Sequence, residues 1–129
     1  MKDIEVWDTN DLRDITAVLT ERAKRSVWDV VEYVDPTGEA YFDIAGPQTE
    51  LFNALVNTGR RISGADFLRE ALTTPQVIWG TFRAFDNAEA DLPWLLLDGV
   101  DSTFWRIRTR DIPTRQAMLK AFRQTKQTG

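Results

Sequence analysis

Carboxylates are the residues of this chain whose types and spacing could support acid–base or metal chemistry. Asp98 and Asp101 lie three residues apart, and Glu89 and Asp91 lie on the other side of the apolar segment 93–97. Paired carboxylates can act as general acid and base, and carboxylate oxygens are ligands that Mg²⁺ and Ca²⁺ prefer. The spacing matches no EF-hand, however, and Asp is common in turns because its side chain bonds nearby backbone N–H groups. A carboxylate enzyme is therefore one hypothesis, and ordinary turn residues are the simpler one.

The absence of two residue types narrows the chemistry further. The 129 residues contain no His and no Cys, which excludes the Ser-His triad, cysteine nucleophiles, disulfides and thiolate metal sites. No Gly-x-Gly-x-x-Gly or Walker-type sequence occurs, and none of the three serines lies in a nucleophile elbow. We therefore expect a protein that is not an enzyme and that binds no cofactor and no metal.

Charge is distributed unevenly along the chain. Twenty Asp and Glu residues against 16 Lys and Arg residues give a formal net charge of −4, which disfavours a general nucleic-acid binder. The segment 26–59 contains six acidic residues and no basic one, and the segment 86–101 contains five and again none. The segment 106–126 carries seven basic residues and one acidic residue. This distribution predicts either two halves that neutralise each other in the fold or an acidic surface that attracts a basic partner.

Three arginines stand at alternate positions, Arg106, Arg108 and Arg110, within a predicted strand. The two-residue repeat of a strand places them on one face together with Phe104. Such a face is typical of sheets that stack on bases and contact phosphates. The simpler interpretation is an exposed face whose arginines pair with acidic residues of the segment 27–44.

The first half of the chain contains helix and hairpin signals. Apolar residues recur at helical spacing over 9–25, after three candidate N-cap residues at positions 8–10. A run of β-branched and aromatic residues over 27–34, the turn sequence Asp35-Pro36-Thr37-Gly38 and an alternating run over 40–44 predict a hairpin.

The remaining elements are expected in the following chain order. They are a helix opened by Gly46-Pro47 and ended by Gly59, a helix capped by Ser63 and ended by Pro75, strands over 77–85 and 93–97, a tight turn at Asp98-Gly99, a strand over 100–109, and a helix capped by Asp111.

These elements predict a single α+β domain over residues 1–129, in the order α-ββ-αα-βββ-α, with a mainly antiparallel sheet of about five strands packed against helices. The tail 124–129 is expected to fray. Four Trp residues on one small sheet are not easily all buried, so at least one should be exposed or line a groove. These four are Trp28, Trp79, Trp94 and Trp105.

The expected compartment is the cytoplasm. The first residues alternate charged and apolar side chains and lack the basic start and continuous apolar run of a secretory signal. The longest uninterrupted apolar run, 94–97, is far shorter than the roughly 20 residues of a membrane span. We therefore expect no association with membranes.

In size, acidity and mixed helix and strand content, the chain resembles two groups of cytoplasmic α+β proteins. These are small acidic immunity proteins that neutralise basic toxins, and small acidic chaperones of bacterial secretion systems. Both work by binding, without cofactors, and the resemblance implies a non-enzymatic module that neutralises or escorts a basic protein, such as a toxin or a secreted cargo. The residues expected at the binding surface are Asp29, Glu32, Asp35, Glu39, Asp43, Trp28 and Tyr41.

Two alternatives stay open beside this hypothesis. One is an accessory protein that forms a homodimer through an exposed sheet edge. The other is a small carboxylate- or metal-dependent enzyme that uses Asp98 and Asp101.

Overall fold

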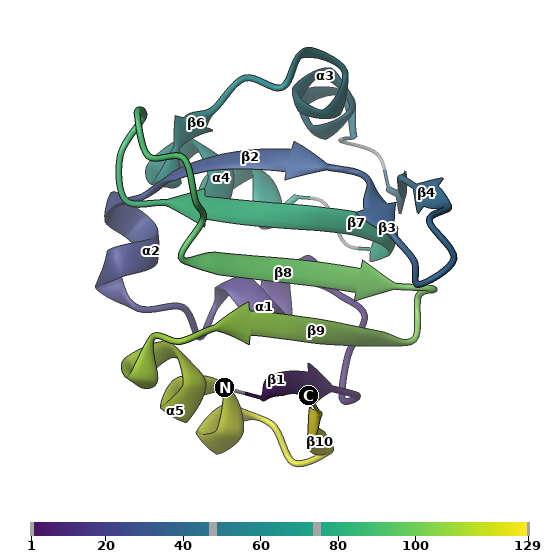
Figure 1. Cartoon of the computed structure of the whole chain (residues 1–129), viewed down its shortest axis with the longest axis vertical. Helices are drawn as coiled ribbons and strands as arrows, with labels where there is room; N and C mark the ends of the chain where they lie inside the picture. Colours follow the sequence, from purple (N-terminus) through teal and green to yellow (C-terminus); the bar gives the residue numbers. More distant parts are fainter. Residues whose placement is uncertain (1, 47–48, 74–75, 129) are drawn as a thin grey trace.

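One antiparallel sheet organises the computed structural model, which describes residues 2–46, 49–73 and 76–128. Its strands are β1 (Asp3–Val6), β2 (Val27–Val31), β5 (Asp43–Ala45), β6 (Ile62–Ser63), β7 (Gln76–Phe85), β8 (Leu95–Val100), β9 (Phe104–Thr109) and β10 (Thr125–Thr128). In this part of the chain the sheet has eight strands in the order β10-β1-β9-β8-β7-β2-β6, and β5 also pairs with β7 (Figure 1). Two short strands, β3 (Tyr33–Val34) and β4 (Ala40–Tyr41), pair only with each other.

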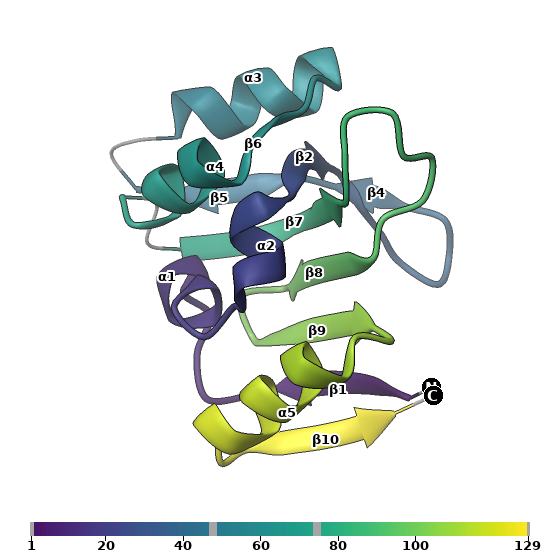
Figure 2. The same cartoon turned by 90° about the vertical axis from the view of Figure 1, so that its left-hand side faces the viewer.

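The helices cover one face of this sheet. They are α1 (Leu12–Thr16), α2 (Glu21–Arg25), α3 (Glu50–Thr58), α4 (Gly64–Ala71) and α5 (Ile112–Ala121). Figure 2 shows α1 and α4 on one side of the strands and β4 on the other. Among the helices of the described residues, none combines the length and the apolar character needed to cross a membrane.

The predicted α+β class with a mainly antiparallel sheet is confirmed, but eight strands replace the expected five and the predicted order is not the observed one. The prediction of a frayed tail is wrong, because β10 pairs with β1. The carboxylate of Asp8 accepts hydrogen bonds from the backbone N–H groups of Arg123 at 3.0 Å and Gln124 at 2.9 Å. Long-range bonds of this kind hold a polar tail that has no apolar pattern of its own.

The predicted helix over 9–25 is two short helices, because the chain leaves the helical path between α1 and α2. Residue Thr20 is extended (φ −84°, ψ 176°) and precedes the first turn of α2. The β-branched residues Thr16, Val18 and Thr20 are poor helix formers, so the break costs little. The N-cap of α1 is Asp11, whose side chain accepts from the Arg13 N–H, and not a residue of 8–10.

The turn predicted at Asp98-Gly99 is also wrong, since both residues lie inside β8. The chain reverses three residues later, where Asp101 and Ser102 adopt positive φ values of 52° and 57°. Gly99 pairs with Trp105 across β8 and β9, and a Cβ atom there would lie 2.7 Å from Val77 Cγ1. The glycine therefore serves close packing on the helix-covered face rather than a turn.

Other predicted terminators are confirmed. Gly59 ends α3 with φ 69°, the Ser63 side chain accepts from the Asp66 N–H at the start of α4, and Asp111 caps α5. Pro47 and Pro75, expected at helix ends, lie outside the described residues.

The core lies between the sheet and the helices and is rich in aromatic side chains. Trp28 of β2 is fully buried and stacks on Phe67 of α4 at 4.1 Å between ring centroids. Phe82 of β7 lies between Phe67 and Trp105, at 5.9 Å and 6.1 Å. Burying rings of this size supplies much of the driving force for folding.

Gly64 lies where α4 approaches α2 most closely. A Cβ atom at this position would lie 2.3 Å from the backbone oxygen of Lys24. On helix propensity alone, Gly64→Ala would stabilise α4 by about 1 kcal/mol. We expect the opposite sign, a loss of about 2 kcal/mol or more in urea unfolding, because backbone atoms must move. Ala65→Gly, at the exposed next position, should cost only about 1 kcal/mol; a stabilised Gly64→Ala protein would contradict the close approach.

Candidate functional site

A short two-stranded ribbon lies on the side of the sheet away from α1 and α4. β2 pairs with residues 81–85 of β7, and β5 pairs with residues 76–79 of the same edge. The chain between β2 and β5 therefore leaves the sheet, and the predicted hairpin over 27–44 forms only at its tip, as β3 and β4. Residues 32–43, which we call the acidic ribbon, project away from the helices (Figure 2).

The turn of the acidic ribbon is built on Asp35. Its Oδ1 accepts hydrogen bonds from the Thr37 hydroxyl at 2.6 Å, the Thr37 N–H at 2.9 Å and the Glu39 N–H at 3.0 Å. The Thr37 hydroxyl, followed by these N–H groups, holds the pKa of Asp35 below its ordinary value. Gly38 completes the turn with φ 90°. The carboxylate thus stays ionised at neutral pH and also fixes the loop.

The acidic ribbon packs on the sheet through an aromatic stack with Trp79 of β7. The Tyr41 ring stacks on Trp79 of β7 at 4.7 Å, and Tyr33 stacks on Trp79 at 5.6 Å. Tyr41 keeps 36% of its surface exposed, whereas Tyr33 is buried and its hydroxyl accepts from Arg106 Nη1 at 3.3 Å. Partial burial and then the charges of Asp35 and Glu39 raise the pKa of Tyr41, so its hydroxyl stays neutral.

The seven residues predicted for partner binding divide into two groups. Glu32, Glu39, Asp43 and Tyr41 are exposed, Asp35 is half-buried in the turn, and all five lie on the acidic ribbon. Trp28 is fully buried, and its indole Nε1 donates to the Ala23 carbonyl at 3.0 Å. Asp29 is 3% exposed. Burial therefore removes Trp28 and Asp29 from any contact surface of this fold.

Asp29 is buried because β7 supplies a counterion that the sequence analysis missed. Arg83 Nε and Nη2 donate to the two carboxylate oxygens of Asp29 at 2.8 Å and 2.7 Å. The two residues are direct cross-strand neighbours. A basic residue at an alternate position of an otherwise apolar strand was the signal that could have identified Arg83.

The arginines of β9 are neutralised within the sheet. Phe104, Arg106 and Arg108 share the helix-free face as predicted, while Trp105 and Ile107 are buried on the other. The predicted pairing with hairpin acids is wrong. Arg106 Nη2 lies 3.8 Å from Oε2 of Glu5 in β1, and Arg108 Nη2 donates to Oδ1 of Asp98 in β8 at 2.9 Å. The strand order, and not proximity in sequence, selects these partners.

Asp98 and Asp101 do not converge on a common site. Asp98 is 1% exposed and accepts from Thr81 at 2.7 Å in addition to Arg108. Asp101 lies in the exposed turn after β8. Across the residues that the structure describes, no group of three or more acidic side chains could hold a metal ion.

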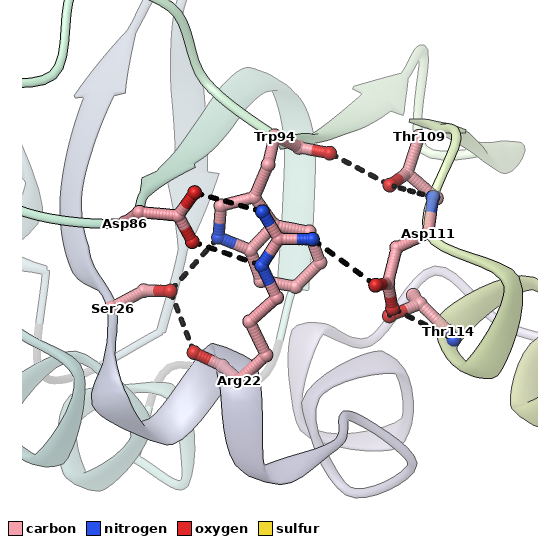
Figure 3. A network of polar contacts seen from close by, with 7 residues as sticks. All are labelled: Arg22, Ser26, Asp86, Trp94, Thr109, Asp111 and Thr114. Atoms are coloured by element: carbon pink, nitrogen blue, oxygen red, sulfur yellow. Dashed lines mark hydrogen bonds and ion pairs between the residues drawn. The ribbon is translucent and has the colours of Figure 1, made fainter.

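A second polar network lies at the other end of β8 (Figure 3). Arg22 of α2 donates to both carboxylate oxygens of Asp86, at 2.9 Å and 2.8 Å, and to Asp111 at 3.1 Å. Its guanidinium also lies 4.2 Å from the centroid of the Trp94 ring. The ion pair with Arg22 lowers the pKa of Asp86. Burial alone would raise the pKa of Asp111, but hydrogen bonds from Thr114 and Arg22 lower it below its ordinary value.

The Arg22 network borders an open depression of about 700 Å³, and Trp94 forms part of its wall. The prediction that at least one of the four tryptophans is exposed or lines a groove is thereby confirmed, although Trp94 directly precedes β8 and does not lie in a strand as expected. Trp28 and Trp105, by contrast, are fully buried.

Comparison of the chain with protein-family models, with curated proteins and with solved structures gives no match.

Arg22→Met should lower the free energy of unfolding at pH 7 by about 1–2 kcal/mol, because it removes the ion pairs and the Trp94 contact. The substitution should also change how the free energy of unfolding depends on pH in the acidic range. The pKa values of Asp86 and Asp111 lie below their ordinary values in the folded protein. Their stabilising contribution is therefore present above about pH 4 and is lost as the pH falls through the folded-state values.

Urea unfolding from about pH 7 to pH 2 measures both effects. The variant should lose less stability than the parent protein below about pH 4. Arg69→Met is the matched control, because it breaks only the exposed Arg69–Asp66 pair of α4. An acid loss in Arg22→Met as steep as in the parent would contradict the role of this network.

Proposed function

We propose that the protein is a non-enzymatic binding module whose acidic ribbon captures a basic protein partner. One observation carries the proposal: the ribbon's carboxylates lack the counterions that other acids of the fold have. Among the described residues, no ion pair involves Glu32, Asp35, Glu39 or Asp43, whereas Asp29, Asp98, Glu5, Asp86 and Asp111 are all paired with arginines. The ribbon therefore presents uncompensated negative charge.

The acidic ribbon also offers an anchor for a partner. Tyr41 is half-exposed and held by its stack on Trp79, and Val34 on the paired strand is 59% exposed. A preorganised aromatic ring loses little conformational entropy on binding, and Tyr is common among residues that dominate interface energies. Charge would then steer the encounter, and Tyr41 would prolong the complex.

Whether the protein neutralises a toxin or escorts a cargo depends on the chemistry of the partner, and the geometry of this chain is the same in both cases. A basic protein is first isolated by affinity capture on the tagged chain at low and high salt. It is then added to cells with and without this protein, and growth distinguishes a toxin from a cargo.

Removing three ribbon charges should slow association. We expect Glu32→Gln/Glu39→Gln/Asp43→Asn to lower the association rate constant about tenfold at low salt, with a much smaller effect at high salt. Asp35 is kept because it builds the turn. The control, Glu89→Gln/Asp91→Asn/Asp101→Asn, changes the net charge equally at exposed positions elsewhere. Equal rates for the ribbon variant and the control in surface plasmon resonance would reject steering by the ribbon.

Truncating the anchor should act on dissociation instead. Tyr41→Ala should raise the dissociation rate constant roughly tenfold or more, since it removes the exposed ring of the stack. Tyr41→Phe keeps the ring and should lie close to the parent protein. If Tyr41→Ala dissociates as slowly as the parent, the ribbon is not the anchor.

A further inference from the structure

The depression beside the Arg22 network has the features of a ligand site that is separate from the acidic ribbon. It lies where β8 begins, β9 ends and α5 starts, and Pro93, Trp94, Leu96 and Ile112 form its apolar wall. Its volume of about 700 Å³ falls within the range of pockets that hold small molecules. The acidic ribbon packs instead on Trp79, whose neighbours on β8 lie at that strand's far end.

The Trp94 wall is fixed before any ligand arrives. The indole Nε1 donates to Ser26 Oγ at 2.9 Å, the backbone N–H donates to the Ala84 carbonyl at 2.9 Å, and the carbonyl accepts from Thr109 Oγ1 at 2.7 Å. Arg22 covers one side of the ring. Figure 3 shows the contacts of Trp94 with Ser26 and Thr109 and the Arg22 side chain beside its ring. A rigid aromatic wall reduces the entropic cost of binding an apolar group.

Guanidinium donors border the same depression. Arg110 is exposed and, among the described residues, forms no ion pair or side-chain hydrogen bond. Arg108, two residues earlier and about 7 Å away along an extended chain, directs Nη2 and Nε to Asp98, and no described contact uses its Nη1. Each of the three guanidinium nitrogens of Arg22 already donates to Asp86 or Asp111. The guanidinium nitrogens without a described partner therefore belong to Arg108 and Arg110.

The charges of the lining residues favour a ligand that carries a single negative charge. Three arginines and two aspartates, Asp3 and Asp111, border the depression. The acids would repel a multiply charged group such as a nucleotide triphosphate, whereas a carboxylate matches the planar, two-pronged geometry of a guanidinium.

We propose that this depression binds a monocarboxylate attached to an apolar body, with Arg110 and Arg108 on the carboxylate and the Trp94 wall against the body. The carboxylate belongs either to a small organic acid or to the C-terminus of a peptide. This proposal does not depend on the function of the acidic ribbon.

The probe is 3-phenylpropionate, and its neutral match is 3-phenylpropionamide. Titration into ¹⁵N-labelled full-length protein, followed by ¹H–¹⁵N NMR, should shift the Trp94 indole signal and the Arg110 amide signal with a dissociation constant of about 1 mM or below. The amide should bind at least tenfold more weakly. No saturable shift by about 10 mM acid, or equal binding of acid and amide, would overturn the proposal.

Variants locate the contact. Arg110→Gln should weaken binding of 3-phenylpropionate about tenfold or more, while Arg123→Gln, an exposed arginine outside the depression, should leave it unchanged. Unchanged binding in Arg110→Gln would overturn the assignment. Tyr41→Ala should bind the probe like the parent, so a failed ribbon hypothesis and a failed pocket hypothesis give different results.

The two sources of the carboxylate are then compared. A hexapeptide ending in Phe with a free carboxylate is titrated beside the same peptide with a C-terminal amide. Tighter binding of the free-acid peptide than of 3-phenylpropionate would identify a peptide terminus as the ligand, and weaker binding would identify a small acid.

Discussion

The rest of the structure depends on one constraint, which is that β7 can pair with only one strand at a time along each of its two sides. Each residue of a strand can pair with only one neighbour on each side, and β8 occupies one side of β7. The other side is divided between β2 and β5. The eleven-residue connection between these two strands, 32–42, consequently has no place in the sheet. It folds on itself as β3 and β4 and, together with Asp43 at the start of β5, forms the acidic ribbon, whose carboxylates take part in no ion pair among the described residues.

The two faces of the sheet follow from the same pairing. Registers between adjacent strands align Trp28, Ala84 and Leu95 in one apolar row, and Val30, Phe82, Leu97, Ile107 and Ile4 in another. On the opposite face, the row that runs from Asp98 through Arg106 and Glu5 to Lys126 alternates in sign. Pairs of this kind contribute little stability where they are exposed, but a buried carboxylate such as Asp98 would be costly without its arginine. Charge is thereby balanced across the sheet face and left unbalanced on the ribbon.

The two candidate sites lie at opposite ends of β8 and differ in sign. The acidic ribbon packs beside the end of β8, and the depression with Arg108 and Arg110 lies beside its beginning. Each rests on a tryptophan held by its surroundings, Trp79 under the ribbon and Trp94 in the depression. The described residues thus carry an exposed acidic ribbon and, apart from it, a depression bordered by arginines. Their separation permits independent tests of each.

Local chemistry was predictable from the sequence alone because it depends on neighbours within a few residues. Several local features follow from side chains near their own backbone. They are the caps Ser63 and Asp111, the end of α3 at Gly59, the Asp35–Gly38 turn and the shared face of the arginines in β9. Most of the residues of the acidic ribbon were identified in the same way, from a run of acids around a turn. Only the tertiary structure decided the partners of each charge, the burial of Trp28 and Asp29, and the pairing of the two chain ends. These depend on strand order, which brings Arg83 to Asp29, Glu5 to Arg106 and β10 to β1 across 54 to more than 100 residues. No local pattern carries that information, because the free energy that selects one strand order comes from burial and charge pairing over the whole sheet.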